Sequence, residues 1–153
     1  MDIRWAWGGV IALLQNRRVT LLRRGLARAY LLRNGQLQVL LYEDTLARHP
    51  EYAAQPGALA ALGGYGSTPI SLFTPRDSHA SAPPLEIDML PGDRLIFALG
   101  TELLNALADP ARERLLACSE PNVVADMPAT RDMELDGWGV VAIDIEPPRE
   151  DPA

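Results

Sequence analysis

The sequence contains no lysine, because all fourteen of its basic residues are arginine. Chemistry that needs a lysine amine, such as Schiff-base formation or the phosphate contact of a P-loop, is therefore excluded. The single cysteine, Cys118, excludes an internal disulfide and a zinc site built on cysteines. A nearly cysteine-free chain fits a reducing compartment, so we expect a cytoplasmic protein.

Long hydrophobic runs are also absent. The uncharged stretch 5–16 has twelve residues, whereas a membrane-spanning helix needs about 20. The uncharged stretch 52–75 is interrupted by glycine, proline and serine, so we expect no membrane contact. What remains is an ordinary soluble composition of 153 residues, 48% hydrophobic and 22% charged. We assign residues 1–146 to one domain and residues 147–153 to an acidic flexible tail.

Charge is unevenly distributed along the chain, whose net charge is −6. Residues 1–35 carry seven arginines and one acid, whereas residues 36–153 carry seven arginines and nineteen acids. A basic segment of this kind marks either a surface for nucleic acid or an acidic partner, or a strand rim lined with arginine. No nucleic-acid-binding motif accompanies the arginines, so we favour the strand rim and expect no nucleic acid.

Strand patterns dominate the first third of the sequence. Asn34-Gly35 separates two apolar runs and predicts a hairpin with a type I′ turn, because both residues accept a positive φ. Asn16-Arg17 is a second plausible turn, and Gly25 indicates a bulge or a close backbone approach. Strands are expected over residues 9–15, 18–23, 27–33, 36–42, 69–73, 85–89, 94–99 and 138–145. The run 94–99 is continuously apolar, which is typical of a strand buried on both faces.

Helical patterns follow the strands. Leucines at helical spacing begin near Thr101, and Asp109-Pro110 starts a second helix with a capping carboxylate and a proline at the first position. The predicted fold class is therefore α+β, an antiparallel β meander or sheet with a C-terminal helical hairpin.

Several short pieces occur in an informative order: Gly8-Gly9, Gly25-Leu26-Ala27-Arg28-Ala29-Tyr30, Arg33-Asn34-Gly35, Gly63-Gly64, Leu90-Pro91-Gly92-Asp93 and Asp136-Gly137. This series resembles the C-terminal part of the metal-dependent (PPM, type 2C) protein serine/threonine phosphatases. In that family a strand ends in Gly-Asp-Ser-Arg-Ala-Tyr and turns through Arg-Asp-Gly. A Pro-Gly-Asp turn then feeds a strand ending in Ser-Asp-Gly, and the last strand starts with Asp-Asn. The resemblance implies part of an α-β-β-α sandwich.

The metal ligands are where the sequence departs from that family. The resemblance implies two divalent metals held by carboxylates, but Leu26 stands at the aspartate of Gly-Asp-Ser-Arg, and Ser-Asp-Gly has no counterpart. Asp136 alone matches a family ligand, and Glu102 lies near the position of the lost aspartate. The alternative roles are a turn residue for Asp136 and a helix-start glutamate for Glu102. The family's N-terminal metal motifs have no counterpart either, because Met1 lies only a few residues before the first matching strand.

Other chemistry-bearing residues have simpler interpretations. The triad residue types of Asp77-Ser78-His79 stand in a proline-flanked loop, where sequence adjacency gives no triad geometry. His49 has no second histidine at ligand spacing and is expected at the surface. The glycine-rich stretch 63–68 is interpreted as a loop, because neither a lysine nor a clear helix follows it. Cys118 is interpreted as a structural thiol.

Three hypotheses follow. The leading one is a pseudophosphatase, a non-catalytic binding or regulatory module with no cofactor. The second is half of an active serine/threonine phosphatase, completed by another segment or chain and using Mn²⁺ or Mg²⁺. The third is an unrelated small α+β binding domain. Because half of such a sandwich leaves an apolar sheet face open, we also expect a protein partner or self-association.

Overall fold

The computed structural model describes residues 8–55, 57, 60, 61, 63–73, 83–99 and 139–146. Its strands are β1 (Gly9–Gln15), β2 (Arg18–Arg24), β3 (Ala27–Arg33), β4 (Gln36–Leu41), β5 (Leu85–Asp88), β6 (Arg94–Leu99) and β7 (Gly139–Asp144). The short helices are η1 (Leu46–Arg48), α1 (Pro50–Ala53) and η2 (Gly63–Ser67). The predicted helices from Thr101 and Asp109, and the tail 147–153, lie outside the described residues.

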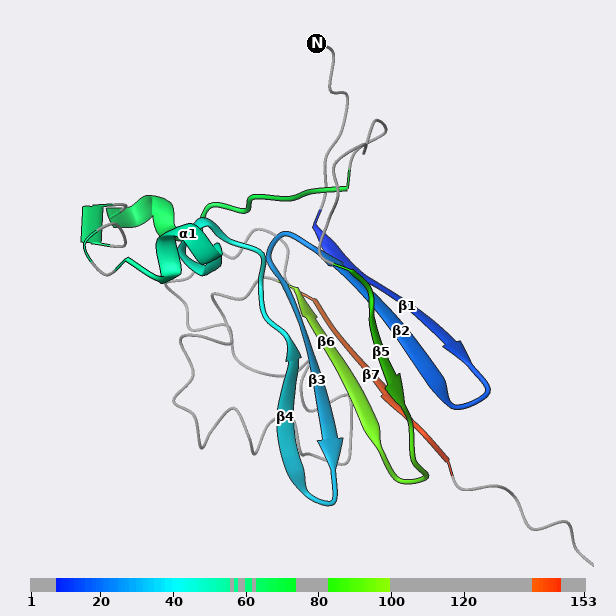
Figure 1. The fold of residues 1–153 in the computed structure, drawn as a ribbon. Coiled ribbons are helices and arrows are strands. Elements are labelled where there is room, and N and C mark those ends of the chain that lie inside the picture. Colours follow the sequence, from blue (N-terminus) through cyan, green and yellow to red (C-terminus); the bar gives the residue numbers. More distant parts are fainter. Residues whose placement is uncertain are drawn as a thin grey trace, which may run out of the picture.

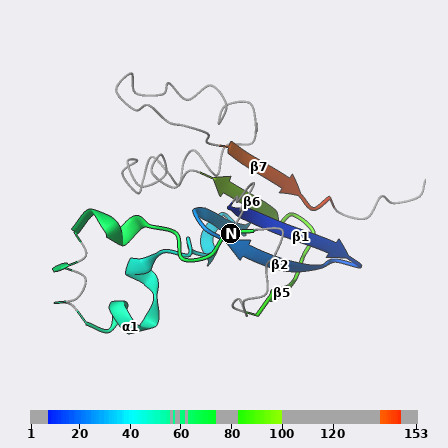
Figure 2. The ribbon, with the colours of Figure 1, turned by 90° about the horizontal axis from the view of Figure 1, so that it is seen from above.

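The strands form two sheets, which Figures 1 and 2 show from two sides. One has the order β1-β2-β5 and the other β4-β3-β6-β7, and every neighbouring pair is antiparallel. The strand positions agree with the sequence prediction, apart from 69–73, which forms no strand and has isolated bridge residues at Pro69, paired with Thr45, and at Phe73. The prediction of one continuous meander was wrong in one respect, because β2 and β3 belong to different sheets.

Gly25 is where the chain passes from the first sheet to the second. Its φ of +66° lies in the left-handed region, and a Cβ there would stand 3.1 Å from Leu72 Cδ2 and 3.3 Å from the Ser71 carbonyl oxygen. Only glycine fits both the conformation and the space. Of the two alternatives predicted for Gly25, a bulge or a close backbone approach, the close approach is confirmed.

Both predicted hairpin turns are present. Asn16 and Arg17 have φ values of 48° and 62°, and Asn34 and Gly35 have φ values of 52° and 73°. Two consecutive positive φ angles define a type I′ turn, whose twist matches that of the flanking strands. The two turns fix the registers of the β1–β2 and β3–β4 hairpins.

The main core lies between the sheets. It contains inward-facing residues of β2 and β3, together with Met89 directly after β5 and Leu95 of β6: Val19, Leu21, Ala29, Leu31, Met89 and Leu95. A second cluster of Tyr30, Ile96 and Ala98 occupies the opposite face of the second sheet. Strand β6 is thus buried on both faces, as its continuous apolar run predicted. Within the described ranges, no helix is long and apolar enough to cross a membrane.

Candidate functional site

The strand that precedes Glu102 in the sequence and the strand that follows Asp136 meet at one end of the second sheet, the upper end in Figure 1. Strand β6 ends there at Leu99, β7 begins there at Gly139, and these two residues pair directly. The start of β3 is the third member, because Ala27 pairs with Leu99. The chain segments that carry family metal ligands would leave and enter the sheet at this end.

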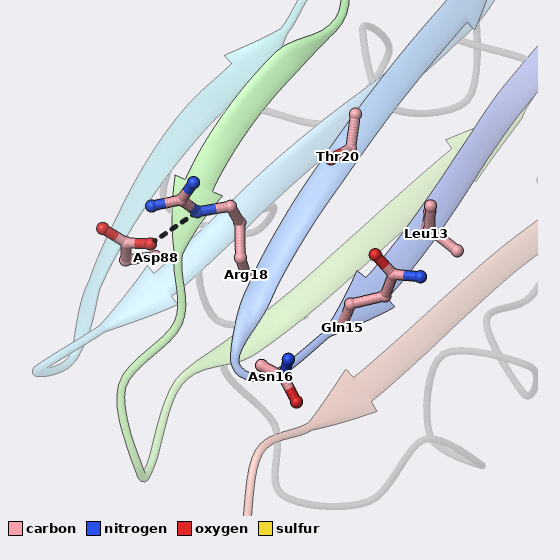
Figure 3. A pocket seen from close by; sticks show the side chains of 6 residues that line it. All are labelled: Leu13, Gln15, Asn16, Arg18, Thr20 and Asp88. Atoms are coloured by element: carbon pink, nitrogen blue, oxygen red, sulfur yellow. Dashed lines mark hydrogen bonds and ion pairs between the residues drawn. The ribbon is translucent and has the colours of Figure 1, made fainter.

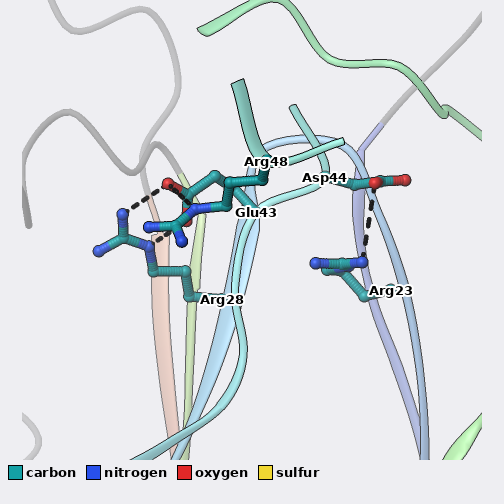
Figure 4. Close-up of polar contacts among 5 residues, drawn as sticks. All are labelled: Arg23, Arg28, Glu43, Asp44 and Arg48. Atoms are coloured by element: carbon teal, nitrogen blue, oxygen red, sulfur yellow. Dashed lines mark hydrogen bonds and ion pairs between the residues drawn. The ribbon is translucent and has the colours of Figure 1, made fainter. Parts of the chain in front are cut away.

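A cluster of arginines and acids occupies this end, which we call the arginine end: Arg23, Arg28, Glu43, Asp44 and Arg48 (Figure 4). Glu43, in the segment after β4, is buried, with its side chain 9% exposed. Arg28 Nη2 donates to Glu43 Oε1 at 2.7 Å, and Arg28 Nε donates to Oε2. Arg48 Nε donates to Glu43 Oε1 at 3.1 Å. One carboxylate is therefore shared by two guanidinium groups.

The two arginines keep Glu43 ionised. Burial by itself would raise the pKa of the Glu43 carboxyl, but the hydrogen bonds from Arg28 and Arg48 lower that pKa to about 2. The same pairing raises the pKa of the Arg28 guanidinium above its ordinary value. The Arg48 guanidinium also lies over the Tyr42 ring, 4.2 Å from its centroid. The cluster is thus charge-paired and held rigidly by planar contacts.

Asp44 is held in a second set of contacts beside the first. Its carboxylate accepts a hydrogen bond from the Ser71 hydroxyl and lies 3.7 Å from Arg23 Nη2. Its backbone N–H donates to the Gly25 carbonyl oxygen at 2.9 Å, and its carbonyl accepts from the Ile70 N–H at 3.1 Å. Asp44 therefore links Gly25, where the chain passes between the two sheets, to the segment that follows η2.

The opposite end of the second sheet is closed by Asp93 of the Pro-Gly-Asp turn. Arg33 donates to its two carboxylate oxygens at 2.9 and 2.6 Å, and the Leu90 N–H donates to one of them at 2.6 Å. The hydrogen bonds from Arg33 lower the pKa of the Asp93 carboxyl. Two motifs quoted for the resemblance, the turns at Arg33-Asn34-Gly35 and Pro91-Gly92-Asp93, are thus in direct contact.

A shallow hollow of about 360 Å³ lies on the outward face of the first sheet (Figure 3). Leu13, Gln15, Asn16, Arg18, Thr20 and Asp88 line it. Its charged groups pair with each other, since Arg18 Nε donates to Asp88 at 3.1 Å. This exposed hollow lies on β1, β2 and β5, away from the arginine end.

Comparison with solved structures identifies the architecture. PppA of Pseudomonas aeruginosa, described as a key regulatory component of T6SS, matches at 19% identity over 76% of this chain and 46% of its own, with a TM-score of 0.54. The PPM Ser-Thr phosphatase MsPP of Mycobacterium smegmatis matches at 20% identity over 83% and 56%, with a TM-score of 0.55. The catalytic domain of the serine threonine phosphatase PstP, solved with two manganese ions, matches at 19% identity over 76% and 47%, also at 0.55.

The fold is that of part of a PPM-type phosphatase domain. The chain spans about half the length of these solved structures. No family model and no curated protein matches the sequence. The predicted resemblance is therefore confirmed for the fold.

The described carboxylates do not fit a PPM metal centre. A divalent cation of this kind needs several free carboxylate oxygens, and the described ranges contain no group of three acidic, histidine or cysteine residues able to hold a metal. Glu43 and Asp44 lie at the arginine end, but their oxygens face arginines and a serine hydroxyl. The predicted ligands Asp136 and Glu102 lie outside the described residues.

Some of the other residues considered in the sequence analysis lie outside the described ranges, and the rest lie within them. Cys118 and Asp77-Ser78-His79 lie outside the described residues. His49 is half-buried against Tyr52, with ring centroids 6.1 Å apart, rather than fully exposed. The stretch 63–68, expected as a loop, contains the 3₁₀ helix η2.

The Glu43 cluster is the feature that the sequence analysis missed. Arg28 belongs to the Arg-Ala-Tyr piece of the PPM resemblance, but its partner Glu43 is fifteen residues further on. The sequence signal for this cluster was the adjacent pair of acids Glu43 and Asp44 shortly after β4, since the neighbouring strand β3 carries Arg28. Two acids at the end of a hairpin can pair with cations at the start of that hairpin, because the two ends lie side by side.

Proposed function

We propose that the chain is a PPM-type pseudophosphatase domain, a non-catalytic module that acts in the cytoplasm by binding a protein or a second copy of itself. It requires neither a metal cofactor nor nucleic acid nor a membrane. The fold supports the PPM part of this proposal, and the state of the carboxylates at the arginine end supports the absence of catalysis.

One observation carries the proposal: the Glu43 carboxylate is already neutralised by Arg28 and Arg48. A divalent cation at this carboxylate would have to displace two guanidinium groups or stand close to both. Either arrangement is costly, because like charges within about 4 Å repel strongly in a partly buried site. This end of the domain is thus built to hold charge pairs that stabilise the fold.

The second candidate is half of an active metal-dependent serine/threonine phosphatase. It is favoured by the carboxylate at Asp136, which matches a family ligand, with Glu102 as a substitute for the missing aspartate. The remaining ligands of Mn²⁺ or Mg²⁺ would come from another segment or chain. The described part of the chain contains no group of three or more acidic, histidine or cysteine residues that could hold a metal ion.

Metal titration and turnover separate the two candidates. The full chain is titrated with MnCl₂ and MgCl₂ by calorimetry, and hydrolysis of a phosphoserine peptide and of an aryl phosphate is followed with each metal. We expect no saturable heat of binding and no turnover above that of an Asp136→Asn variant. Metal-dependent turnover that Asp136→Asn abolishes would establish the second candidate and refute the first.

A further inference from the structure

Strand β1 forms the edge of the first sheet within the described residues and is poorly protected there. Ile11, Leu13 and Leu14 are 47%, 53% and 46% exposed. The strand Gly9–Gln15 contains neither a charged residue nor a proline, which are the usual devices that stop an edge from pairing. An apolar edge of this kind is a template for another strand.

The hairpin turn determines which backbone groups face that open side. In a two-residue type I′ hairpin the closing pair, here Gln15 and Arg18, exchanges both backbone hydrogen bonds. Bonding to β2 then alternates along β1, so Val10, Ala12 and Leu14 direct their N–H and C=O groups away from β2. These three residues offer a row of donors and acceptors at the edge.

The same three residues make the strand complementary to itself. Ala12 is the midpoint of β1, so an antiparallel two-fold pairing centred on Ala12 places it against its own copy. Val10 then stands opposite Leu14 of the second copy, and both are bonding residues. Ile11 stands opposite Leu13 of the second copy on the outward face. Every outward-directed backbone group of Val10, Ala12 and Leu14 gains a partner, and no charge is brought against a charge.

We propose that β1 pairs with β1 of a second copy of this chain, antiparallel and centred on Ala12, to form one continuous six-stranded sheet. The pairing is isologous, since the same strand serves both copies. This inference rests on the proposed binding function and names its partner. Edge pairing of two seven-residue strands buries less than the roughly 1,600 Å² of a standard interface, so we expect a dimer that dissociates on dilution.

Sedimentation over a range of protein concentrations tests the dimer. Leu13→Arg places a charge opposite Ile11 of the second copy and is expected to weaken the dimer at least about tenfold, which corresponds to about 1.4 kcal/mol. The matched control is Val141→Arg, because Val141 is 55% exposed on β7, the edge strand of the other described sheet. Circular dichroism checks that each variant remains folded.

Cysteine cross-linking tests the register in a Cys118→Ser background. Residues of a hydrogen-bonded antiparallel pair have Cα atoms about 5.5 Å apart, within disulfide range. Ala12→Cys is therefore expected to form a disulfide dimer on mild oxidation. Val10→Cys is the control, because its two copies would lie four residues apart along the strands, about 13 Å, too far for a disulfide.

Three results would overturn the proposal: a monomer at all concentrations, a dimer that Val141→Arg breaks and Leu13→Arg does not, or equal cross-linking of both cysteine variants. A monomer that associates only with a different protein would assign the edge to that protein. The metal and turnover measurements are independent of these results, so failure of the dimer leaves the absence of catalysis to be judged separately.

Discussion

Replacing Glu43 with glutamine tests the charge cluster at the arginine end. The carboxylate is buried, and its pKa is lowered from the ordinary 4.5 to about 2. That difference corresponds to about 3 kcal/mol of preference for the ionised form in the folded protein. Glu43→Gln removes the charge and with it the ion pair between Glu43 and Arg28, whose side chain is 5% exposed. We therefore expect the free energy of unfolding to fall by about 3 kcal/mol at pH 7.

The pH dependence gives this prediction a second readout. Because the folded pKa of Glu43 lies below its unfolded value, its stabilisation is complete above about pH 4.5 and is lost as the pH falls through about 2. The difference in stability between the parent chain and Glu43→Gln should therefore shrink over that window. Urea unfolding at pH 7, 4.5 and 2.5 measures it, and a thermal scan should show a Tm about 9 °C lower at pH 7.

Two further variants serve as controls for the effect of Glu43→Gln on stability. Glu86→Gln removes an exposed acid that lies 3.8 Å from Arg18, and we expect a loss below about 1 kcal/mol. An Arg28→Met, Glu43→Leu double variant replaces the buried pair with apolar groups and should recover most of the stability lost in Glu43→Gln. If Glu43→Gln unfolds at the same urea concentration as the parent chain, the reasoning about the cluster is refuted.

Two further changes test the turns. Gly25→Ala should cost at least about 1 kcal/mol more than Gly35→Ala in urea unfolding, since both positions have positive φ but only at Gly25 would the added Cβ meet other atoms; equal losses would contradict the close approach. Asp93→Asn should cost about 2 kcal/mol at pH 7, because the carboxylate is buried against Arg33. Its lowered pKa makes this stabilisation present above its ordinary 3.8 and lost as the pH falls below that value. Asp144→Asn, at a side chain 54% exposed, is the control and should cost less than about 1 kcal/mol; an equal loss would contradict the assigned role of Asp93.

Local patterns predicted the strands well because their determinants are local. Asn34-Gly35 fixes a type I′ turn by its own conformational preferences, and the apolar run of β6 indicates burial on both faces without reference to any partner. The assignment of strands to sheets is different. Strand β5 pairs with β2, more than sixty residues earlier, and nothing in either sequence names the other. The split at Gly25 belongs to this class, since a glycine between strands is equally compatible with a bulge.

The candidate site was harder to predict than the fold. The resemblance named Asp136 and Glu102, which lie outside the described residues, and the absence of family aspartates predicted an incomplete metal centre. It gave no indication of the cluster in which Glu43 pairs with Arg28 and Arg48. The pairing of Arg28 with Glu43 depends on the β3–β4 hairpin closing behind both residues, and the contact with Arg48 depends on η1 folding over that hairpin. Such contacts follow from tertiary structure and have no motif.

The uneven charge of the sequence now has a structural explanation. Four arginines of the basic segment recur at intervals of five residues, and each pairs with an acid from the acidic remainder: Arg18 with Asp88, Arg23 with Asp44, Arg28 with Glu43 and Arg33 with Asp93. The positive charge of residues 1–35 is thus largely neutralised within the fold, which leaves less of it to attract an acidic partner. Arginine suits this role better than lysine would, because Arg28 and Arg33 each hold both oxygens of one carboxylate. The second copy that we propose as partner is therefore expected at the uncharged β1 edge rather than at the arginines.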